Sequence, residues 1–291
     1  MTEVKQDKYS AIWVSYSSIG DFLKCPRGYF LKNIYRNERN RKINVVSPSL
    51  SLGSAVHEVL EGLLNYKAEE RALQPLGAQF EENWKKFSGK QGGFKTKEEE
   101  TEAKARGLAM IARVAKNMGP LLHKAVKLPP HANDMPPNFI LSEEENIVLS
   151  GKIDWLEYVE ADDSVRVIDF KTGKKDEDQN SLQLPIYTLL LNALQKRKVS
   201  GATYWYLERN DTPTNVALPN IVVAREKVLE AAMKVKKARE VGVFECPRRV
   251  GGSALSRAEG CFACRDFEKI LRGEAELVKV DEVRRTELYM V

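Results

Sequence analysis

Hydrophobic residues recur at two different spacings along the chain, and each spacing predicts a different element. Over 53–66, "GSAVHEVLEGLLNY", apolar side chains fall three or four residues apart, which is the spacing of one helix face. The sequence predicts further helices over 15–36, 68–87 with a break near Pro75, 98–118, 179–197 and 225–241. It predicts strands over 139–160 with a turn near 142–145, and over 165–172, 201–208 and 215–224.

Helices come both before and after the strands in this order of elements. Such an order is typical of an α/β fold in which a mixed sheet is flanked by helices. The strands within 139–172 follow one another closely, so we expect an antiparallel meander there. No connecting segment is distinct enough to divide the chain, and we therefore expect a single domain over 1–291.

Composition and charge narrow the class of protein only slightly. Of the 291 residues, 43% are hydrophobic and 30% are charged, with 46 basic and 41 acidic residues and a net charge of +5. This mild excess allows an anionic partner without requiring one. Basic clusters occur at 24–42, 171–175, 196–198 and 247–249. They suit phosphate contacts, and they suit a solvated surface equally well.

The chain also lacks the marks of a membrane or secreted protein. No window holds the roughly 18 uncharged apolar residues of a membrane span. The first residues, "MTEVKQDKYSAIWVSYSS", lack the apolar run of a signal peptide. We therefore expect a cytoplasmic protein with no membrane partner.

Two opposite charges stand two positions apart in the strand "VIDFKTG" (167–173). Side chains alternate along a strand, so Asp169 and Lys171 share one face and Phe170 takes the other. Alone, this pattern fits a surface ion pair. Asp154 in "SGKIDWLEY" ends near Asp169 if the two strands pair through the turn at 161–164. Two carboxylates together suit Mg²⁺ or Mn²⁺, and a nearby lysine can orient a water or stabilise phosphate charge.

Two helices carry polar residues one turn apart that fit the same site. His57 and Glu61 are spaced i, i+4 on the helix over 53–66, and Gln183 and Tyr187 repeat this spacing later. Each of these residues also has an ordinary structural explanation, since a lone histidine or tyrosine often packs. Pro185 predicts that the later helix begins near 181 or bends there.

Four motifs, taken in order, resemble the RecB-like branch of the PD-(D/E)XK nuclease superfamily. They are "GSAVHEVLE", "GKIDWLEY", "VIDFKTG" and "QLPIY", and the resemblance covers about Ser15 to Phe267. It implies a restriction-endonuclease-like fold and a metal-dependent DNA exonuclease that acts on single-stranded ends. The implied site has a Mg²⁺ or Mn²⁺ held by His57, Asp154, Asp169 and the carbonyl of Phe170, the catalytic lysine Lys171, and the supporting residues Gln183 and Tyr187.

Four cysteines lie near the two ends of the chain, at Cys25, Cys246, Cys261 and Cys264. Structural disulfides are unusual in a cytosolic protein, so a metal site is considered. The resemblance implies a 4Fe–4S cluster that joins 15–45 to 244–267, with one early and three late cysteines. The family's usual last cysteine is missing after Cys264, and Cys246 is the candidate to replace it. A Zn²⁺ site and a metal-free set of buried thiols are the alternatives.

Several roles are compatible with this sequence. Nucleases of CRISPR adaptation and of phage recombination resemble it equally, so recombination, repair or CRISPR adaptation proteins are candidate partners beside DNA. A DNA-binding or scaffold module and a redox-sensing metalloprotein are the rivals from other classes. Four aromatic residues among basic ones suit either base stacking or the core, namely Tyr16, Tyr29, Phe30 and Tyr35. The role of the polar tail over 272–291 is undetermined.

Overall fold

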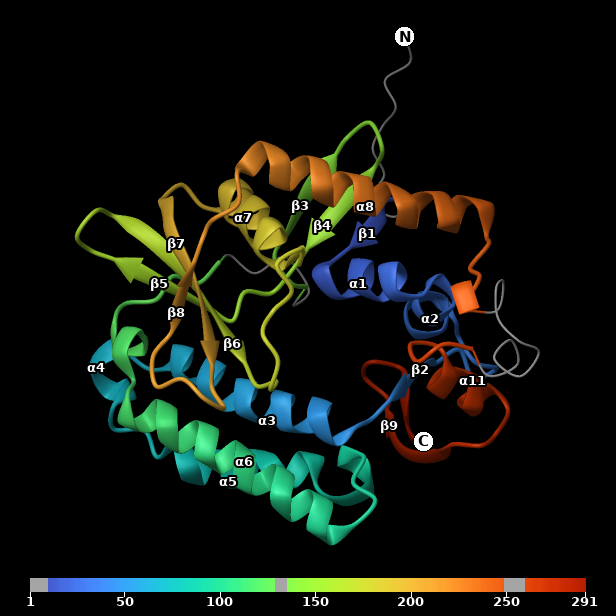
Figure 1. Ribbon diagram of the computed structural model, residues 1–291, viewed down its shortest axis with the longest axis horizontal. Helices are drawn as coiled ribbons and strands as arrows, with labels where there is room; N and C mark the ends of the chain where they lie inside the picture. The colour runs from blue at the N-terminus through green and yellow to red at the C-terminus, as the bar shows by residue number, and fades with distance from the viewer. Residues whose placement is uncertain (1–9, 129–134, 249–259) are drawn as a thin grey trace.

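The computed structural model describes residues 10–128, 135–248 and 260–291, and its elements are arranged around a central opening (Figure 1). The strands are β1 (Ile12–Val14), β2 (Lys42–Val45), β3 (Asn138–Ser142), β4 (Ile147–Ser150), β5 (Trp155–Val159), β6 (Ser164–Lys171), β7 (Lys198–Tyr206), β8 (Thr214–Val216), β9 (Glu276–Asp281) and β10 (Thr286–Met290). The longer helices are α1 (Tyr16–Lys24), α3 (Pro48–Gly62), α5 (Leu76–Trp84), α6 (Lys97–Lys116), α7 (Gln183–Leu194) and α8 (Ile221–Val241). The short ones are α2 (Pro26–Tyr29), a π-helical turn (Phe30–Ile34), α4 (Ala68–Arg71) and α11 (Arg265–Leu271). Single 3₁₀ turns are Leu63–Asn65, Lys85–Phe87, Gly89–Gly92 and Gly119–Leu122.

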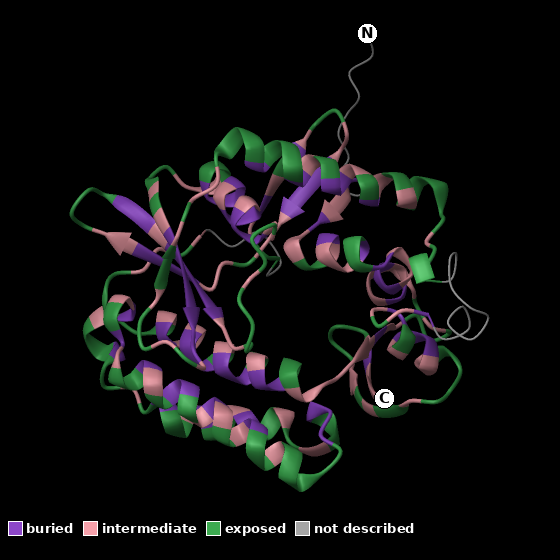
Figure 2. Cartoon of the chain, viewed as in Figure 1, coloured by how far each residue is buried: buried purple, intermediate pink, exposed green. Residues whose placement is uncertain are grey.

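The main sheet is mixed, which confirms the predicted fold class. Its strand order is β5-β6-β7-β8, with β6 and β7 parallel and the two outer pairs antiparallel. One face packs against α7 and α8, and the other packs against α3, α5 and α6, which we call the helical lobe. Buried residues are concentrated in the strands and on the helix faces turned towards them (Figure 2).

The meander predicted over 139–172 is divided between two sheets. β3 and β4 are antiparallel as expected, but they belong to a second sheet of order β1-β4-β3. The chain leaves this sheet after Ser150 and enters the main one at Trp155. Gly151 allows close packing at this crossing, because a Cβ there would lie 2.7 Å from Cδ1 of Leu190 in α7.

Local capping explains where the site helices begin. α3 begins at Pro48, earlier than predicted, because the Ser47 hydroxyl accepts from the Leu50 amide and proline suits the first helical position. α7 begins at Gln183, so Pro185 lies in the first turn, where its missing amide costs no helical hydrogen bond.

One predicted strand is wrong. Residues 221–224, "IVVA", open α8 instead of continuing the strand over 215–224. The Asn220 side chain accepts hydrogen bonds from the amides of Val222 and Val223, and this cap starts the helix. The β-branched residues are tolerated there because two of the valines are exposed and pack little.

The segment 272–291, whose role the sequence leaves open, contains a β-hairpin. β9 pairs antiparallel with β10, and β10 pairs in parallel with β2, so the end of the chain completes a sheet begun near residue 42. The buried Glu287 accepts from Asn37, and Lys90 pairs with Glu276 at 2.8 Å. The hairpin thereby joins the N-terminal region to the turn beside the helical lobe.

Two further points concern the limits of the described chain. None of its described helices combines the length and the apolar composition that crossing a membrane requires. Residues 249–259, which include part of the basic run 247–249 and of the segment 244–267, lie outside the described residues.

Candidate active site

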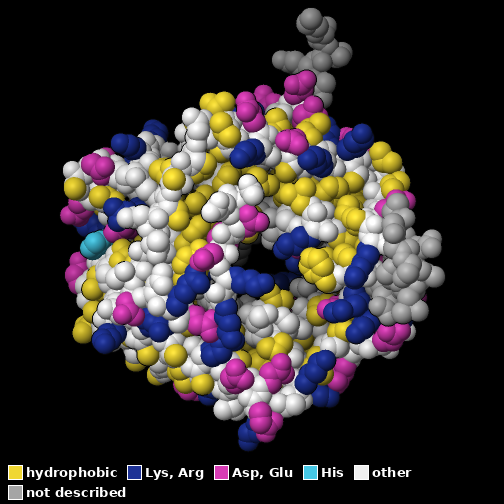
Figure 3. Space-filling view, in the orientation of Figure 1, with side chains coloured by type: hydrophobic (Ala, Val, Ile, Leu, Met, Phe, Trp, Pro, Cys, Tyr) yellow, Lys and Arg dark blue, Asp and Glu magenta, His cyan; other side chains and the backbone are white. Residues whose placement is uncertain are grey.

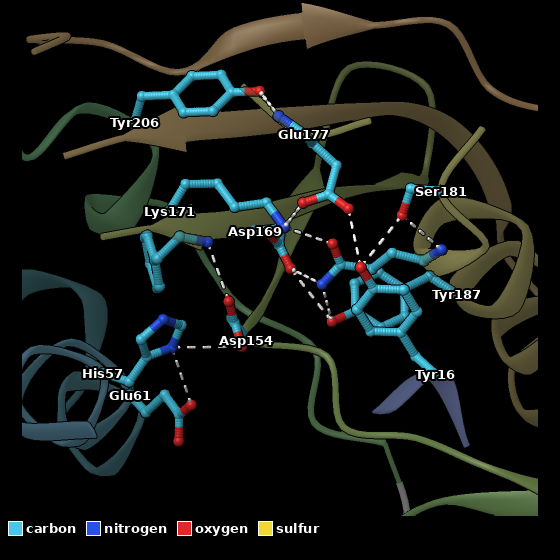
Figure 4. A network of polar contacts seen from close by, with 12 residues as sticks. Tyr16, His57, Glu61, Asp154, Asp169, Lys171, Glu177, Ser181, Tyr187 and Tyr206 are labelled. Carbon is cyan, nitrogen blue, oxygen red and sulfur yellow. Dashed lines mark hydrogen bonds and ion pairs between the residues drawn. The ribbon is translucent and has the colours of Figure 1, made fainter. Parts of the chain in front are cut away.

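The end of β6 places Asp169 and Lys171 on one face of the sheet, as strand alternation predicts. Phe170 points the other way, into the core of the helical lobe. Asp169 is buried, and its Oδ1 accepts from Gln183 Nε2 at 2.7 Å and from the Tyr187 hydroxyl at 3.2 Å. Lys171 Nζ lies 2.9 Å from Asp169 Oδ2 and also donates to Gln183 (Figure 4). The sheet and α7 therefore hold this carboxylate and lysine together.

Asp154 stands immediately before β5 and reaches the same strand end. Its Oδ2 accepts from the Phe170 amide at 2.9 Å, and its Oδ1 lies 3.5 Å from His57 Nδ1. The same His57 nitrogen lies 3.6 Å from Glu61 Oε1, one turn later on α3. α3 thus brings an imidazole and a carboxylate up to the sheet (Figure 4).

The donor atoms fall into two neighbouring groups. His57, Glu61 and Asp154 each offer one ligand atom, and these atoms all lie within 4.8 Å of one another. Asp169 lies outside this triplet and is held by α7 and Lys171. A set of one imidazole and two carboxylates suits a divalent cation such as Mn²⁺. Glu61, which the sequence places one helical turn after His57, is therefore a candidate ligand in this group.

Burial and neighbouring charges perturb the acids and the histidine. Burial and the nearby Asp154 charge raise the pKa of Asp169 to about 6, against the opposing effect of Lys171. Burial lowers the pKa of His57, but hydrogen bonds to Asp154 and Glu61 outweigh it and raise that pKa to about 10. The imidazole can ligate a cation only after releasing this proton.

One buried oxygen shows that the site suits a further positive charge. Asp169 Oδ2 is buried and accepts no hydrogen bond within the described part of the chain, although Lys171 Nζ stands 2.9 Å away as an ion partner. Lys171 offsets only part of the cost of burying this carboxylate, because burial and the nearby Asp154 charge still disfavour its ionised form. A cation shared with Asp154 would relieve that repulsion, so the residues present fit a divalent metal.

Two residues of this network are missed by the sequence patterns. Glu177 Oε2 lies 2.7 Å from Lys171 Nζ, and Glu177 Oε1 accepts from the Tyr16 hydroxyl at 2.8 Å. Ser181 Oγ donates to the same hydroxyl (Figure 4). Glu177 sits in the irregular charged loop after β6, where no periodicity marks it. Tyr16, expected to stack on a base or to pack, packs against the main core and also donates this hydrogen bond.

The four cysteines form a second centre. One Sγ from each of Cys25, Cys246, Cys261 and Cys264 lies within 4.8 Å of the others, and three of the four residues are buried. Cys246 is therefore in the group, as its proposed replacement of the missing cysteine requires. Burial raises the pKa of Cys25 to about 11, so a bound metal would be needed to keep its thiolate.

Local geometry brings the two cysteine segments into contact. Cys25 ends α1 and caps α2, where it accepts from the Gly28 amide at 3.4 Å. A Cβ on Gly28 would lie 2.7 Å from the Ala263 carbonyl oxygen, so only glycine allows this approach. Of the aromatic residues nearby, Tyr29 belongs to the core, while Phe30 and Tyr35 are partly buried beside Leu31.

The comparison with known families decides the identity of the fold. A model described as the PD-(D/E)XK nuclease superfamily matches residues 13–282. The chain belongs to this superfamily. It matches no curated protein. As a PD-(D/E)XK nuclease it acts on nucleic acid with divalent metal, and the acids, histidine and lysine described above lie within the matched residues.

Proposed function

We propose that this PD-(D/E)XK nuclease is an exonuclease that hydrolyses DNA from single-stranded ends. The observation that carries the proposal is the position of the site beside the central opening, which the chain surrounds as a ring. Figure 3 shows this face of the molecule hollowed at its centre, with Lys and Arg side chains along parts of the rim. The Glu177 and Tyr16 edge of the site lines a cavity of about 470 Å³ between α1 and the loop at 177–182.

Each side chain of the site has a proposed part in the reaction. Asp154, Asp169 and His57 hold Mg²⁺ or Mn²⁺, with the carbonyl of Phe170, and Glu61 is placed to join them. The bound cation lowers the pKa of a water and polarises a phosphoryl oxygen. Lys171 orients the water or neutralises charge that develops on the phosphate. Gln183 and Tyr187 fix the Asp169 carboxylate and, through Gln183, the lysine.

Two contacts complete the ring on the side opposite the active site. A closed ring favours a nuclease that acts at the ends of a DNA strand. The cysteine centre joins the N-terminal α1–α2 region to the C-terminal segment, and the hairpin β9–β10 pairs with β2. A strand inside such a ring has to enter by a free end.

The cysteine centre is proposed to hold a metal. Resemblance to the RecB-like branch favours a 4Fe–4S cluster, for which thiolates are the usual ligands. The sulfur spacing favours a second candidate, because Cys261 and Cys264 Sγ lie 3.9 Å apart. In a tetrahedral Zn²⁺ site with Zn–S bonds of about 2.3 Å, two ligand sulfurs lie about 3.8 Å apart. Roles in recombination, repair or CRISPR adaptation, with partners from those systems, rest on the resemblance, and a cytoplasmic location is proposed from the sequence composition.

Degradation of linear and circular single-stranded DNA of equal length tests the exonuclease proposal. With Mn²⁺, we expect loss of the end-labelled linear strand while the circle persists. Cutting of the circle would identify an endonuclease and contradict the threading argument. If the well-folded protein binds both substrates but cuts neither, a DNA-binding module is the better description.

A further inference from the structure

Two neighbouring cavities lie along α1, one beside the active site and one beside the cysteine centre. The cavity beside Glu177 and Ser181 also contacts Asp21 and Lys24 of α1. A second cavity, of about 240 Å³, contacts the same two residues and extends to β2, the start of α3 and the loop between the late cysteines. Because the two cavities share these residues, we describe them together as the α1 groove.

Three large apolar side chains from separate elements stand exposed along this groove. Leu23 of α1 is 51% exposed, Leu50 of α3 is 62% exposed and Phe262 of the cysteine loop is 72% exposed. A single exposed apolar residue needs no explanation, but three around one groove mark a binding surface. An apolar group also lies beside the central opening, next to basic side chains (Figure 3).

The charges that line the α1 groove are mixed: Glu177 and Asp178 line the cavity beside the active site, and Lys24 and Lys32 line the cavity nearer the cysteine centre, where they can contact phosphates. Asp21 is paired with Lys32, whose Nζ lies 3.0 Å from its carboxylate. The exposed Lys24 lies between the two cavities and adds a positive charge at their junction. Aromatic and apolar side chains interleaved with lysine are the features with which proteins bind bases and phosphates of a single strand.

The Phe262 ring is carried by a firmly held loop. The amides of Cys264 and Arg265 both donate to the Cys261 carbonyl, at 3.1 and 2.8 Å. The neighbouring Ala263 carbonyl packs directly on Gly28 of α2. An exposed ring on a fixed backbone loses little freedom when a flat group stacks on it.

We propose that the α1 groove binds single-stranded DNA beyond the active site, with a base stacked on Phe262 and a phosphate held by Lys24. The inference rests on the proposed nuclease function and adds to it a base-contacting residue outside the metal-binding site. The α1 groove begins at the Glu177 side of the site, and this position favours a nucleic acid over a protein segment. The strand would run from the catalytic lysine, past α1, to the cysteine loop.

Binding of a fluorescent single strand, followed by anisotropy with Ca²⁺ in place of the catalytic cation, tests the stacking contact. We expect Phe262→Ala to weaken binding about tenfold and Phe262→Trp to bind at least as tightly as the wild type. Val283→Ala, at a 96% exposed position outside the groove, serves as the matched control and leaves binding unchanged. For a strand with abasic sites throughout, Phe262→Ala and the wild type should bind with equal affinity. Such a strand keeps its phosphates but has no bases to stack on the ring.

Two further variants separate the contacts and guard against a folding artefact. Leu50→Ala, on a different element, is expected to weaken binding of the normal strand as well. Lys24→Ala should reduce the slope of log K against log salt by about 0.7, the effect of one phosphate on a single strand, whereas Phe262→Ala leaves that slope unchanged. If the wild type binds and cuts DNA but Phe262→Ala and Leu50→Ala bind like it, the groove proposal is wrong and the proposed function stands. If the wild type neither binds nor cuts DNA, both fail.

Discussion

Replacing Lys171 with alanine lowers the rate constant for DNA cleavage by about 10²–10³-fold, the usual cost of removing one group that stabilises developing charge. Nζ of this lysine is the cation nearest the buried Asp169 Oδ2, and it contacts Glu177 and Gln183 as well. On the proposed mechanism, its removal leaves neither the attacking water oriented nor the developing phosphate charge neutralised. Single-turnover kinetics on a linear single strand measure the change directly.

The matched control is Lys174→Ala, in the same basic run but exposed, which should cleave like the wild type. Binding of Mn²⁺ by Lys171→Ala, measured by calorimetry, should persist because the lysine is not a proposed ligand. Loss of metal binding together with activity would show that the substitution has disturbed the carboxylates. Full activity in Lys171→Ala would remove this residue from the mechanism.

Replacing Cys246 with serine should release the metal from the cysteine centre and lower the melting temperature by at least about 5 °C. A centre joining residues 25 and 264 closes a very long loop, and opening such a link costs about 3 kcal/mol or more by analogy with a long-loop disulfide. Elemental analysis, visible absorption and thermal unfolding of protein purified without oxygen provide the readouts. Iron with sulfide would identify the cluster, and zinc would identify the single-ion alternative.

Glu245→Ala is the control for this experiment, because Glu245 is exposed and adjacent to Cys246. It should keep both the metal and the melting temperature. A Cys246→Ser protein with unchanged metal content would show that Cys246 is not a ligand despite its place in the group. Wild-type protein without any metal would support the alternative of free buried thiols.

The parts of the site that the sequence could predict depend on local periodicity. Alternation along one strand places Asp169 and Lys171 together, and helical spacing places His57 beside Glu61. Pairing of neighbouring strands then brings Asp154 to the Phe170 amide. In each case the contact follows from a regular element or from a short connection.

Contacts that depend on irregular or distant segments could not be predicted in this way. The hydrogen bond between Tyr16 and Glu177 joins residues 161 positions apart, and one of them lies in a loop. The parallel pairing of β10 with β2 likewise joins the two ends of the chain. The failed strand at 221–224 shows that one capping residue, Asn220, can outweigh a run of β-branched residues.

The most direct test of the central claim is the metal dependence of cleavage by the purified wild type. End-labelled single-stranded DNA is incubated with Mg²⁺ or Mn²⁺, with EDTA, and with EDTA followed by excess Mn²⁺. The carboxylate and histidine site predicts cleavage with the metals, none in EDTA and recovery on adding Mn²⁺. Cleavage that EDTA does not affect, or no cleavage by folded protein under any of these conditions, would contradict a metal-dependent nuclease site at Asp154, Asp169 and Lys171.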